Sequence, residues 1–319
     1  MANAFTGGAS GAAWDLLVET AYDRAVEYYL RDEPQWRQVI DKRPVAQAMP
    51  GDVVTLTLHN SLALATSALT ETVDPDAVAA PAPTRVNVTL QEWGNAALGT
   101  LRLFKTGFTK PDAELAQLIG LNQIDSVDAI IRSVADAGTN LIWVNGGVVK
   151  TTGGANASVT ATDLLTRAPA TIAPKILARN KVMPKQGPFY AAMIHPDVSY
   201  DLQSENSATA WTAPHVYGTD TANIYTGTTG DFQRARYVET TRCNITTDGA
   251  AGAKVYSTYY LGRQALVEAS VEEPHVVVGP QTDKLKRFFP IGWYALAGWA
   301  IYRPTALQTV RTSSSIAGL

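Results

Sequence analysis

The stretch that organises the chain is PDAELAQLIGLNQIDSVDAIIRSVADA, residues 111–137. It opens with Pro111 and Asp112, which suit a first helical turn, and Gly138 follows as a stop signal. Between these ends, apolar residues recur every three or four positions in one stripe: Leu115, Leu118, Ile119, Ile124, Val127, Ile131 and Val134. A helix of this length reaches ~40 Å. Because such a helix usually lies across a sheet, we expect it to form a spine.

Two alternating segments precede this helix, VVTLTL at 53–58 and RVNVTLQ at 85–91, and each predicts a strand. The 26 residues between them, 59–84, are rich in Ala, Thr and Ser and end in proline-containing turns. Connections longer than ~12–15 residues are uncommon inside compact domains. We therefore expect a long two-stranded arm with an extended tip. An isolated hairpin is only marginally stable, so this arm needs another surface to lie on.

An amphipathic helix is predicted near the start of the chain, over 14–30, after a small and polar segment, 1–13, that we expect to be mobile or extended. A polar stretch broken by Pro44 and Pro50 separates this helix from the strands. A helix isolated in this way cannot bury its own stripe. It must dock on its own domain or on a neighbour.

A second region follows a Gly/Thr-rich boundary at 145–163. It contains a helical pattern at 170–182, a strand at 189–194 that turns into a helix, and a loop-rich stretch at 211–230. Further strands are predicted around 236–241, 254–261 and 275–278, and the end of the chain, 288–310, reads as two apolar strands joined near Arg303 and Pro304. The length suggests two domains, or one domain with large insertions.

The composition excludes several classes of protein. Of the 319 residues, 46% are hydrophobic and 17% charged, the net charge is −3, and Ala and Thr supply about a quarter. The apolar fraction is too high for a disordered chain, and the single cysteine, Cys243, excludes a disulfide scaffold. One cysteine and four scattered histidines make no metal cluster. The low charge suggests that copies of the chain cover much of its surface.

Targeting and partner signals are equally sparse. No apolar run precedes the first basic residue, Arg24, so no secretory signal is expected. The most apolar stretch, 288–302, is shorter than the ~20 residues of a membrane span and contains Pro290. Near-neutral charge argues against a dedicated nucleic-acid binder. We expect a soluble intracellular protein without a membrane partner.

The sequence contains no known catalytic or nucleotide-binding motif of three common kinds: a phosphate-binding glycine loop, a zinc-protease helix or a nucleophile elbow. Two pairs of acidic residues, Glu272-Glu273 and Asp74/Asp76, could act as an acid–base pair or bind a cation. We interpret them as solvated loop charges, which are more common. The basic run 284–287 is compatible with phosphates, with a solvated edge or with an acidic neighbour. We expect three aromatic residues near the C-terminus to pack in the core and not to stack on a ligand: Trp293, Tyr294 and Trp299.

His195 lies at the end of a predicted strand, a position where α/β enzymes often place catalytic groups. A general base needs a partner within hydrogen-bond reach, and only Asp197 and Asp201 are near in sequence. The alternative is a capped strand-to-helix turn in which Asp197 serves the helix N-terminus. We favour the capped turn, and we therefore predict no catalytic residues, no cofactor and no metal.

Several motifs, taken in order, resemble the major capsid proteins of tailed bacteriophages. FYAAMIHPDVSYDL at 189–202 resembles their strand followed by a Pro-Asp turn and an Asp-Leu pair. ANIY at 222–225 and YVET at 237–240 resemble the next segment of the branch typified by the coliphage N-four capsid protein, and IGWYALAGW at 291–299 its C-terminal signature. YRPTAL at 302–307 resembles the closing strand of the HK-ninety-seven capsid protein. These matches keep their order over residues 44–312.

The resemblance implies an α+β, HK-ninety-seven-like capsid fold. Its parts would be an N-terminal arm (1–50), an E-loop hairpin (51–104), a P-domain with the spine helix (105–155), an A-domain (156–283) and C-terminal strands that return to the P-domain (284–319). No lysine lies between Lys42 and Lys105, so the hairpin cannot supply the lysine of a Lys–Asn cross-link. Stabilisation should therefore be non-covalent or come from a separate decoration protein.

The function implied is that of a major capsid protein, which self-assembles through hexamers and pentamers into an icosahedral head around double-stranded DNA. We therefore expect the chain to assemble in the host cytoplasm and to be located in the virion. Its contact with DNA should be weak, and its further partners should be portal, scaffold and decoration proteins. The alternatives are an encapsulin-type nanocompartment shell, a soluble α/β enzyme using His195, and a tail or adaptor component. The subunit contacts are expected at apolar residues of the arm, hairpin and loop region: Trp14, Leu17, Tyr28, Leu62, Leu64, Leu69, Val73, Trp211, Tyr217 and Tyr225.

Overall fold

A computed structural model describes residues 35–44, 51–106 (except 60, 67, 70, 73, 75 and 76), 111–205, 228–280, 285 and 287–317. The predicted helix at 14–30 and nearly all of the loop-rich stretch at 211–230 lie outside these residues. Among the expected contact residues, the structure describes Leu62, Leu64 and Leu69. The others fall outside it: Trp14, Leu17, Tyr28, Val73, Trp211, Tyr217 and Tyr225.

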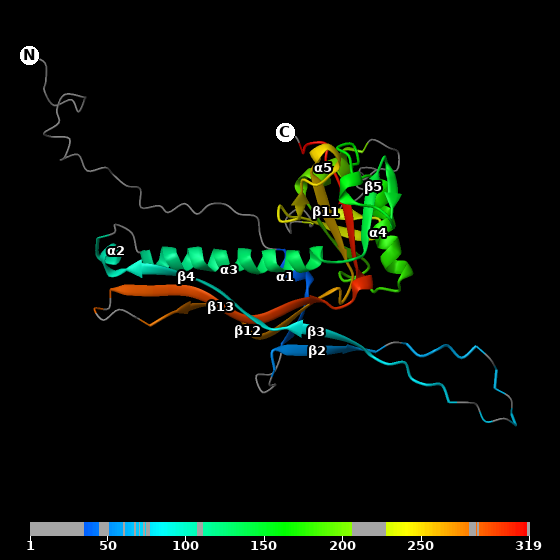
Figure 1. Cartoon of the computed structure of the whole chain (residues 1–319), viewed down its shortest axis with the longest axis horizontal. Coiled ribbons are helices and arrows are strands. Elements are labelled where there is room, and N and C mark those ends of the chain that lie inside the picture. Colours follow the sequence, from blue (N-terminus) through cyan, green and yellow to red (C-terminus); the bar gives the residue numbers. More distant parts are fainter. Residues whose placement is uncertain are drawn as a thin grey trace, which may run out of the picture.

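The predicted spine helix is confirmed as α3 (Pro111–Asp136), which runs along a four-stranded sheet (Figure 1). The strand order is β1 (Asp41–Pro44), β12 (Leu266–Val278), β13 (Phe288–Ile301) and β4 (Gln91–Thr100), with the short helix α2 (Leu101–Thr106) after β4. β1 is parallel to β12, and the other pairs are antiparallel. This spine sheet and its helix form the elongated half of the molecule.

Alternation along β13 explains how the helix is held. Ile291, Trp293 and Ala295 point to one face, where they pack against Leu115 and Ile119 of α3. The same stripe that predicted an amphipathic helix therefore supplies the contact with the sheet. The helix ends at Asp136, and two residues later, at Gly138, a side chain would collide with Leu307.

The hairpin pairs β2 (Val53–Leu58) with β3 (Thr84–Thr89), with Val53 opposite Thr89. Its base packs on the face of the spine sheet opposite α3, and the described tip residues extend away from both sheets (Figure 1). β3 crosses β13 at Gly298, where a Cβ atom would lie 2.2 Å from the Thr89 carbonyl oxygen. The absence of a side chain there allows the two strands to touch.

The second half of the molecule is an eight-stranded mixed sheet. Along it lie β6 (Val148–Lys150), β5 (Leu141–Asn145), β14 (Leu307–Thr312), β11 (Val255–Leu261), β7 (Tyr190–Ile194), β9 (Ala235–Glu239) and β8 (Thr228–Phe232), and β10 (Ile245–Thr246) also pairs with β11. Short 3-10 turns occur at Asn156–Ser158, Ala250–Gly252 and Pro304–Ala306.

Both faces of this sheet are covered at its centre, where β7, β11 and β14 are buried on both sides. Tyr190, Ala192 and Ile194 face the helices α4 (Arg167–Arg179) and α5 (Pro196–Ser204). The alternate residues of β7, Ala191 and Met193, face α1 (Trp36–Val39) and the C-terminal half of α3. The end of the spine helix therefore forms part of the core of both sheets.

The pairing of strands divides the chain differently from the expected order of parts. β4 lies within the expected hairpin segment, 51–104, yet it pairs with β13 along its whole length. β12, within 156–283, belongs to the spine sheet. Of the two strands within 284–319, β13 returns to the spine sheet as expected, whereas β14 lies inside the eight-stranded sheet. Alternation predicts a strand but carries no information on its partner, and these partners are distant in sequence.

Candidate assembly surfaces

The hairpin tip presents an apolar surface that nothing in the described chain covers. Leu62, Leu64 and Leu69 are 53%, 85% and 77% exposed. These are the three expected contact residues that the structure describes, and all three point into solvent. A monomer gains nothing from leucines held so far from its core, so they suit contact with another surface.

The base of the hairpin is held rigidly enough to aim this tip. The Tyr302 hydroxyl donates to the Thr57 carbonyl at 3.1 Å, and the Arg43 guanidinium lies 4.7 Å from the centre of the Tyr302 ring. At the other end of the base, the Leu90 N–H donates to the Asp52 carbonyl at 2.7 Å. The tip therefore projects from a fixed platform.

The segment that leads into the hairpin is anchored by two buried carboxylates. The Trp36 N–H donates to Asp128 Oδ1 at 3.0 Å. The Arg37 Nη2 donates at 2.8 Å to Glu268, which is fully buried and also accepts from Trp299 Nε1 at 3.1 Å. The hydrogen bond with Glu268 raises the pKa of Arg37 above its usual value. α1 and β1 are thus fixed where the two sheets meet.

Asp128 has an unusual electrostatic environment for a carboxylate. Its side chain is 1% exposed, and burial raises its pKa to about 6 although Arg242 and the neighbouring backbone N–H groups oppose the shift. Arg242 donates to Asp128 at 3.4 Å and to the more exposed Asp125 at 2.6 Å. The group therefore takes up a proton in mildly acidic solution.

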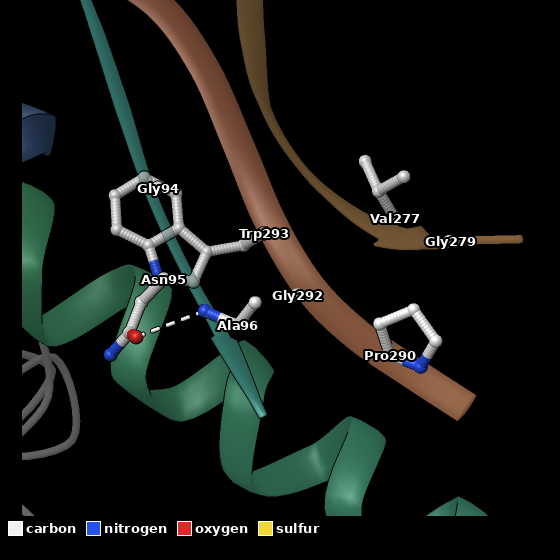
Figure 2. Close-up of a pocket in the computed structure, with 8 residues that line it drawn as sticks. All are labelled: Gly94, Asn95, Ala96, Val277, Gly279, Pro290, Gly292 and Trp293. Carbon is white, nitrogen blue, oxygen red and sulfur yellow. Dashed lines mark hydrogen bonds between the residues drawn. The ribbon is translucent and has the colours of Figure 1, made fainter. Parts of the chain in front are cut away.

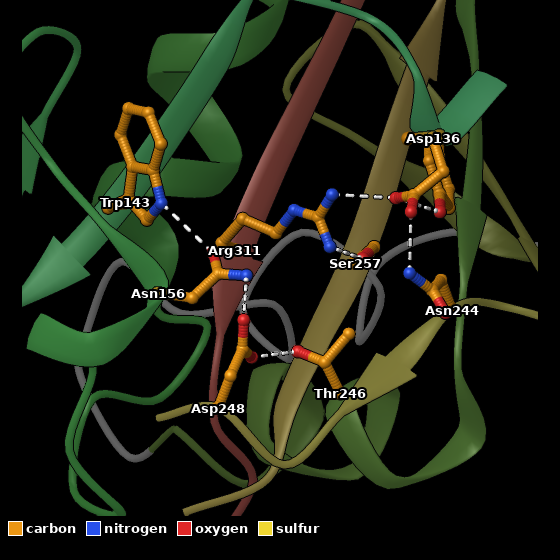
Figure 3. A network of polar contacts seen from close by, with 9 residues as sticks. Asp136, Trp143, Asn156, Asn244, Thr246, Asp248, Ser257 and Arg311 are labelled. Carbon is orange, nitrogen blue, oxygen red and sulfur yellow. Dashed lines mark hydrogen bonds and ion pairs between the residues drawn. The ribbon is translucent and has the colours of Figure 1, made fainter. Parts of the chain in front are cut away.

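A further polar network joins the spine helix to the eight-stranded sheet (Figure 3). Asp136, the last residue of α3, accepts from Arg311 at 2.6 Å, from Tyr259 at 3.0 Å and from Asn244 at 2.6 Å. Arg311 also donates to Ser257 at 2.6 Å. Two strands of the sheet, β14 and β11, and the loop before β10 therefore hold the end of the helix.

His195 caps a helix, as the structural alternative predicted, but the capping atom differs from the expected one. His195 Nδ1 accepts from the Asp197 N–H at 3.2 Å at the start of α5. Asp197 instead accepts from the Tyr256 hydroxyl at 2.8 Å, and Asp201 accepts from the Ser315 N–H at 3.1 Å. Each candidate catalytic carboxylate is thus engaged in holding the fold together.

Two tryptophans that were candidates for ligand stacking, Trp293 and Trp299, have structural contacts as well. Trp293 is 5% exposed and donates to Asn122 on α3 at 3.0 Å, which confirms its core role. Trp299 packs edge-on against Trp93 at 5.9 Å. Cys243 is buried, which suits a small core residue. Lys284 and Lys286 of the basic run lie outside the described residues. Among the residues placed by the structure, no group of three His, Cys, Asp or Glu side chains could hold a metal ion.

A cavity of about 370 Å³ lies near the far end of the spine sheet (Figure 2). The Trp293 ring and the Asn95 amide turn toward α3, whereas Val277 and Pro290 lie away from the helix. Its lining residues are Gly94, Asn95, Ala96, Val277, Gly279, Pro290, Gly292 and Trp293. None of them titrates near neutral pH, so this lining offers shape without acid–base chemistry. No helix in the part of the chain that the structure describes is both long and apolar enough for a bilayer.

Comparison with solved structures supports the α+β, HK-ninety-seven-like fold. The chain is similar to the structure titled cyanophage Pam1 capsid asymmetric unit, with a TM-score of 0.71 and 12% identity over 99% of this chain and 100% of that one. It is also similar to the capsid of Ralstonia phage GP4, with a TM-score of 0.74 and 13% identity over 98% of each chain. The acidic stable capsid structure of Helicobacter pylori bacteriophage KHP30 follows, with a TM-score of 0.65 and 11% identity over 98% of this chain and 100% of that one.

Sequence comparison identifies the family. No curated protein matches the chain. The sequence model of the phage capsid protein family, in contrast, matches residues 12–303, which is most of the chain and spans both sheets. This chain belongs to the phage capsid protein family.

Proposed function

We propose that the chain is the major capsid protein of a tailed bacteriophage, and that it assembles through hexamers and pentamers into the icosahedral head around double-stranded DNA. The observation that carries this proposal is the rigid hairpin whose exposed leucines extend away from both sheets. Many copies of such a contact bury apolar area at ~25 cal/mol per Å². The mechanism is therefore binding and not catalysis, in keeping with a structural protein family.

The parts of the fold take roles that follow their placement. We assign the E-loop to the hairpin built on β2 and β3, the P-domain to α3 with the spine sheet, and the A-domain to the eight-stranded sheet with α4 and α5. The N-terminal arm would comprise residues 1–50, which include the anchored helix α1 beside Asp128. The polar networks of Asp128, Glu268 and the half-buried Asp136 support a body that moves as one piece.

Self-association is supported by the similar structures, whose titles describe phage capsids. Portal, scaffold and decoration proteins are further proposed partners. Without a lysine between Lys42 and Lys105, the hairpin would be held by non-covalent contacts or by a decoration protein. The ordered motifs at 222–225, 237–240 and 291–299 support a place in the coliphage N-four branch. A net charge of −3 suits weak contact with the packaged DNA.

The test is expression of the full chain with its neighbouring genes, followed by electron microscopy and sedimentation. We expect closed shells that assemble in the cytoplasm of the host cell and are recovered as particles. A chain that stays monomeric under these conditions contradicts the proposal. Rings or tubes would instead identify a tail or adaptor component.

Two further measurements separate the remaining alternatives. Particles that contain an enzyme and no nucleic acid would identify a nanocompartment shell. A His195→Ala variant that assembles into normal particles would argue against an enzyme that depends on this side chain.

A further inference from the structure

Three turns meet at a small cavity where the two sheets adjoin. They are the turn after α4, the turn between β11 and β12, and the turn after β13. The cavity has a volume of about 220 Å³ and is lined by Lys181, Val182, Met183, Arg263, Gln264 and Arg303. Three of these six side chains are cationic and none is acidic.

The three cations have no carboxylate partner in the part of the chain that the structure places. None of these three cations forms an ion pair there, whereas four buried or half-buried cations of the core do. The Arg303 side chain is half-buried, and those of Lys181 and Arg263 are exposed at the mouth of the cavity. The carboxylate at the rim, Asp41, accepts from the Gln264 N–H at 2.7 Å, but its charge is matched by Lys185 at 2.9 Å. The cavity therefore concentrates positive charge that its own surroundings leave uncompensated.

The turns are held in place without any ligand. The Arg263 N–H donates to the Met183 carbonyl at 2.9 Å, and the neighbouring Gly262 N–H donates to the Ala306 carbonyl at 2.9 Å. The Tyr302 N–H donates to the Ala265 carbonyl at 2.9 Å. These bonds tie each turn to another, so the cationic side chains start from fixed backbone positions.

The backbone conformation and one unpaired donor at the cavity both indicate a specific binding site. Lys181 and Gln264 both have a positive φ, 55° and 61°, in a region that non-glycine residues rarely adopt. The Arg303 Nε atom is buried and has no hydrogen-bond acceptor among the described residues. An unpaired buried donor costs free energy, so an acceptor placed in the cavity would be stabilising.

We propose that this cavity binds a phosphate group. A phosphate carries nearly two negative charges at neutral pH and several acceptor oxygens, which suits two guanidinium groups and an ammonium better than the single charge of a carboxylate. The ligand is either free inorganic phosphate or a phosphate of a nucleic-acid backbone. The inference rests on the cavity alone and holds whether or not the chain forms a shell.

The test is calorimetric titration of the full-length protein with inorganic phosphate, with ionic strength held constant by sodium chloride. We expect saturable binding of one phosphate per chain. Arg263→Gln and Arg303→Gln should each weaken it about tenfold or more, because each removes a charge-assisted hydrogen bond. Lys175→Gln, which removes an exposed cation on α4 away from the cavity, is the matched control and should bind normally.

A second titration with a short DNA duplex lacking terminal phosphates distinguishes the sources. Competition between duplex and phosphate, lost in the same two arginine variants, assigns the site to a nucleic-acid backbone. Phosphate binding without competition assigns it to the free ion. Absence of saturable phosphate binding, or an equal loss in Lys175→Gln, overturns the proposal. Circular dichroism of each variant confirms that it is folded, which keeps a loss of binding interpretable.

Discussion

The Arg311 guanidinium lies 2.6 Å from the Asp136 carboxylate, so the central strand β14 holds the last residue of the spine helix. Arg311 is 6% exposed and lies near the C-terminal end of the described chain, while Asp136 lies in its first half. The contact joins the helix that supports one sheet to the core of the other. This half-buried ion pair is therefore one of the contacts that join the two halves of this capsid protein.

Breaking this pair should cost more than an exposed ion pair would. We expect Asp136→Ala to lower the free energy of unfolding by about 3 kcal/mol, because Arg311 then stays buried without its charged partner. The double variant Asp136→Ala/Arg311→Met should lose less than the sum of the two single variants. Urea denaturation of all four proteins measures this coupling, and additive effects would show that the two side chains act independently.

Glu268 and Glu273 provide a matched comparison around one arginine. Arg37 contacts the fully buried Glu268 at 2.8 Å and Glu273, whose side chain is 66% exposed, at 3.6 Å. Glu268→Gln should destabilise the protein by about 2 kcal/mol, since it weakens a buried charge-assisted bond. Glu273→Gln should change stability by less than about 0.5 kcal/mol. Equal losses in thermal or chemical unfolding would contradict the anchoring role of Glu268.

Asp128 should make stability depend on pH in the direction opposite to that of most carboxylates. Its pKa is about 6 in the folded protein and 3.8 ordinarily, so between these values the folded state binds more protons than the unfolded state. Its contribution is fully favourable below pH ~4 and declines as pH rises to ~6, by up to about 3 kcal/mol.

The Asp128→Asn variant checks this dependence because it removes the titrating group and keeps an acceptor for the Trp36 N–H. Relative to the unmodified protein, the variant should become progressively more stable as the pH rises from about 4 to about 6, and the difference should level off above. Chemical unfolding at a series of pH values measures it. Parallel stability curves would show that Asp128 does not titrate in this range.

Two glycines should respond to alanine with opposite signs. Gly298→Ala places a Cβ atom against the Thr89 carbonyl, so β3 must shift, and we expect a loss of about 1–3 kcal/mol. Gly120→Ala, in α3, meets no atom within 4 Å and should gain up to about 1 kcal/mol from helix propensity. A neutral result for Gly298→Ala in urea unfolding would mean that the hairpin can move away from β13 at no cost.

The exposed leucines of the hairpin should affect assembly and leave folding unchanged. Leu64→Asp alters a side chain that is 85% exposed, so the free energy of unfolding should change by less than about 0.5 kcal/mol. The yield of particles in sedimentation should nevertheless fall strongly. Val148→Asp, at a 59% exposed position on β6, is the control. Normal assembly of Leu64→Asp would remove the hairpin tip from the subunit contacts.

Local patterns in the sequence predicted many of the individual elements, although not β1 or most of β4. The Pro111 start and the three- and four-residue stripe predicted α3, and alternation predicted β2 and β3, because helix and strand periodicity depend on neighbours along the chain. The same local logic identified His195 as the start of a helix. It also indicated the hairpin, since 26 residues between two strands are too many for a compact turn.

The tertiary structure alone decided which strands pair and which side chains meet. β12 and β14 share the apolar pattern of their neighbours, yet one lies under the spine helix and the other beside β5. The ion pair of Asp136 with Arg311, and the meeting of Lys181, Arg263 and Arg303 at one cavity, bring together residues far apart in sequence. Pairing and burial of charge depend on long-range packing, for which local periodicity carries no signal.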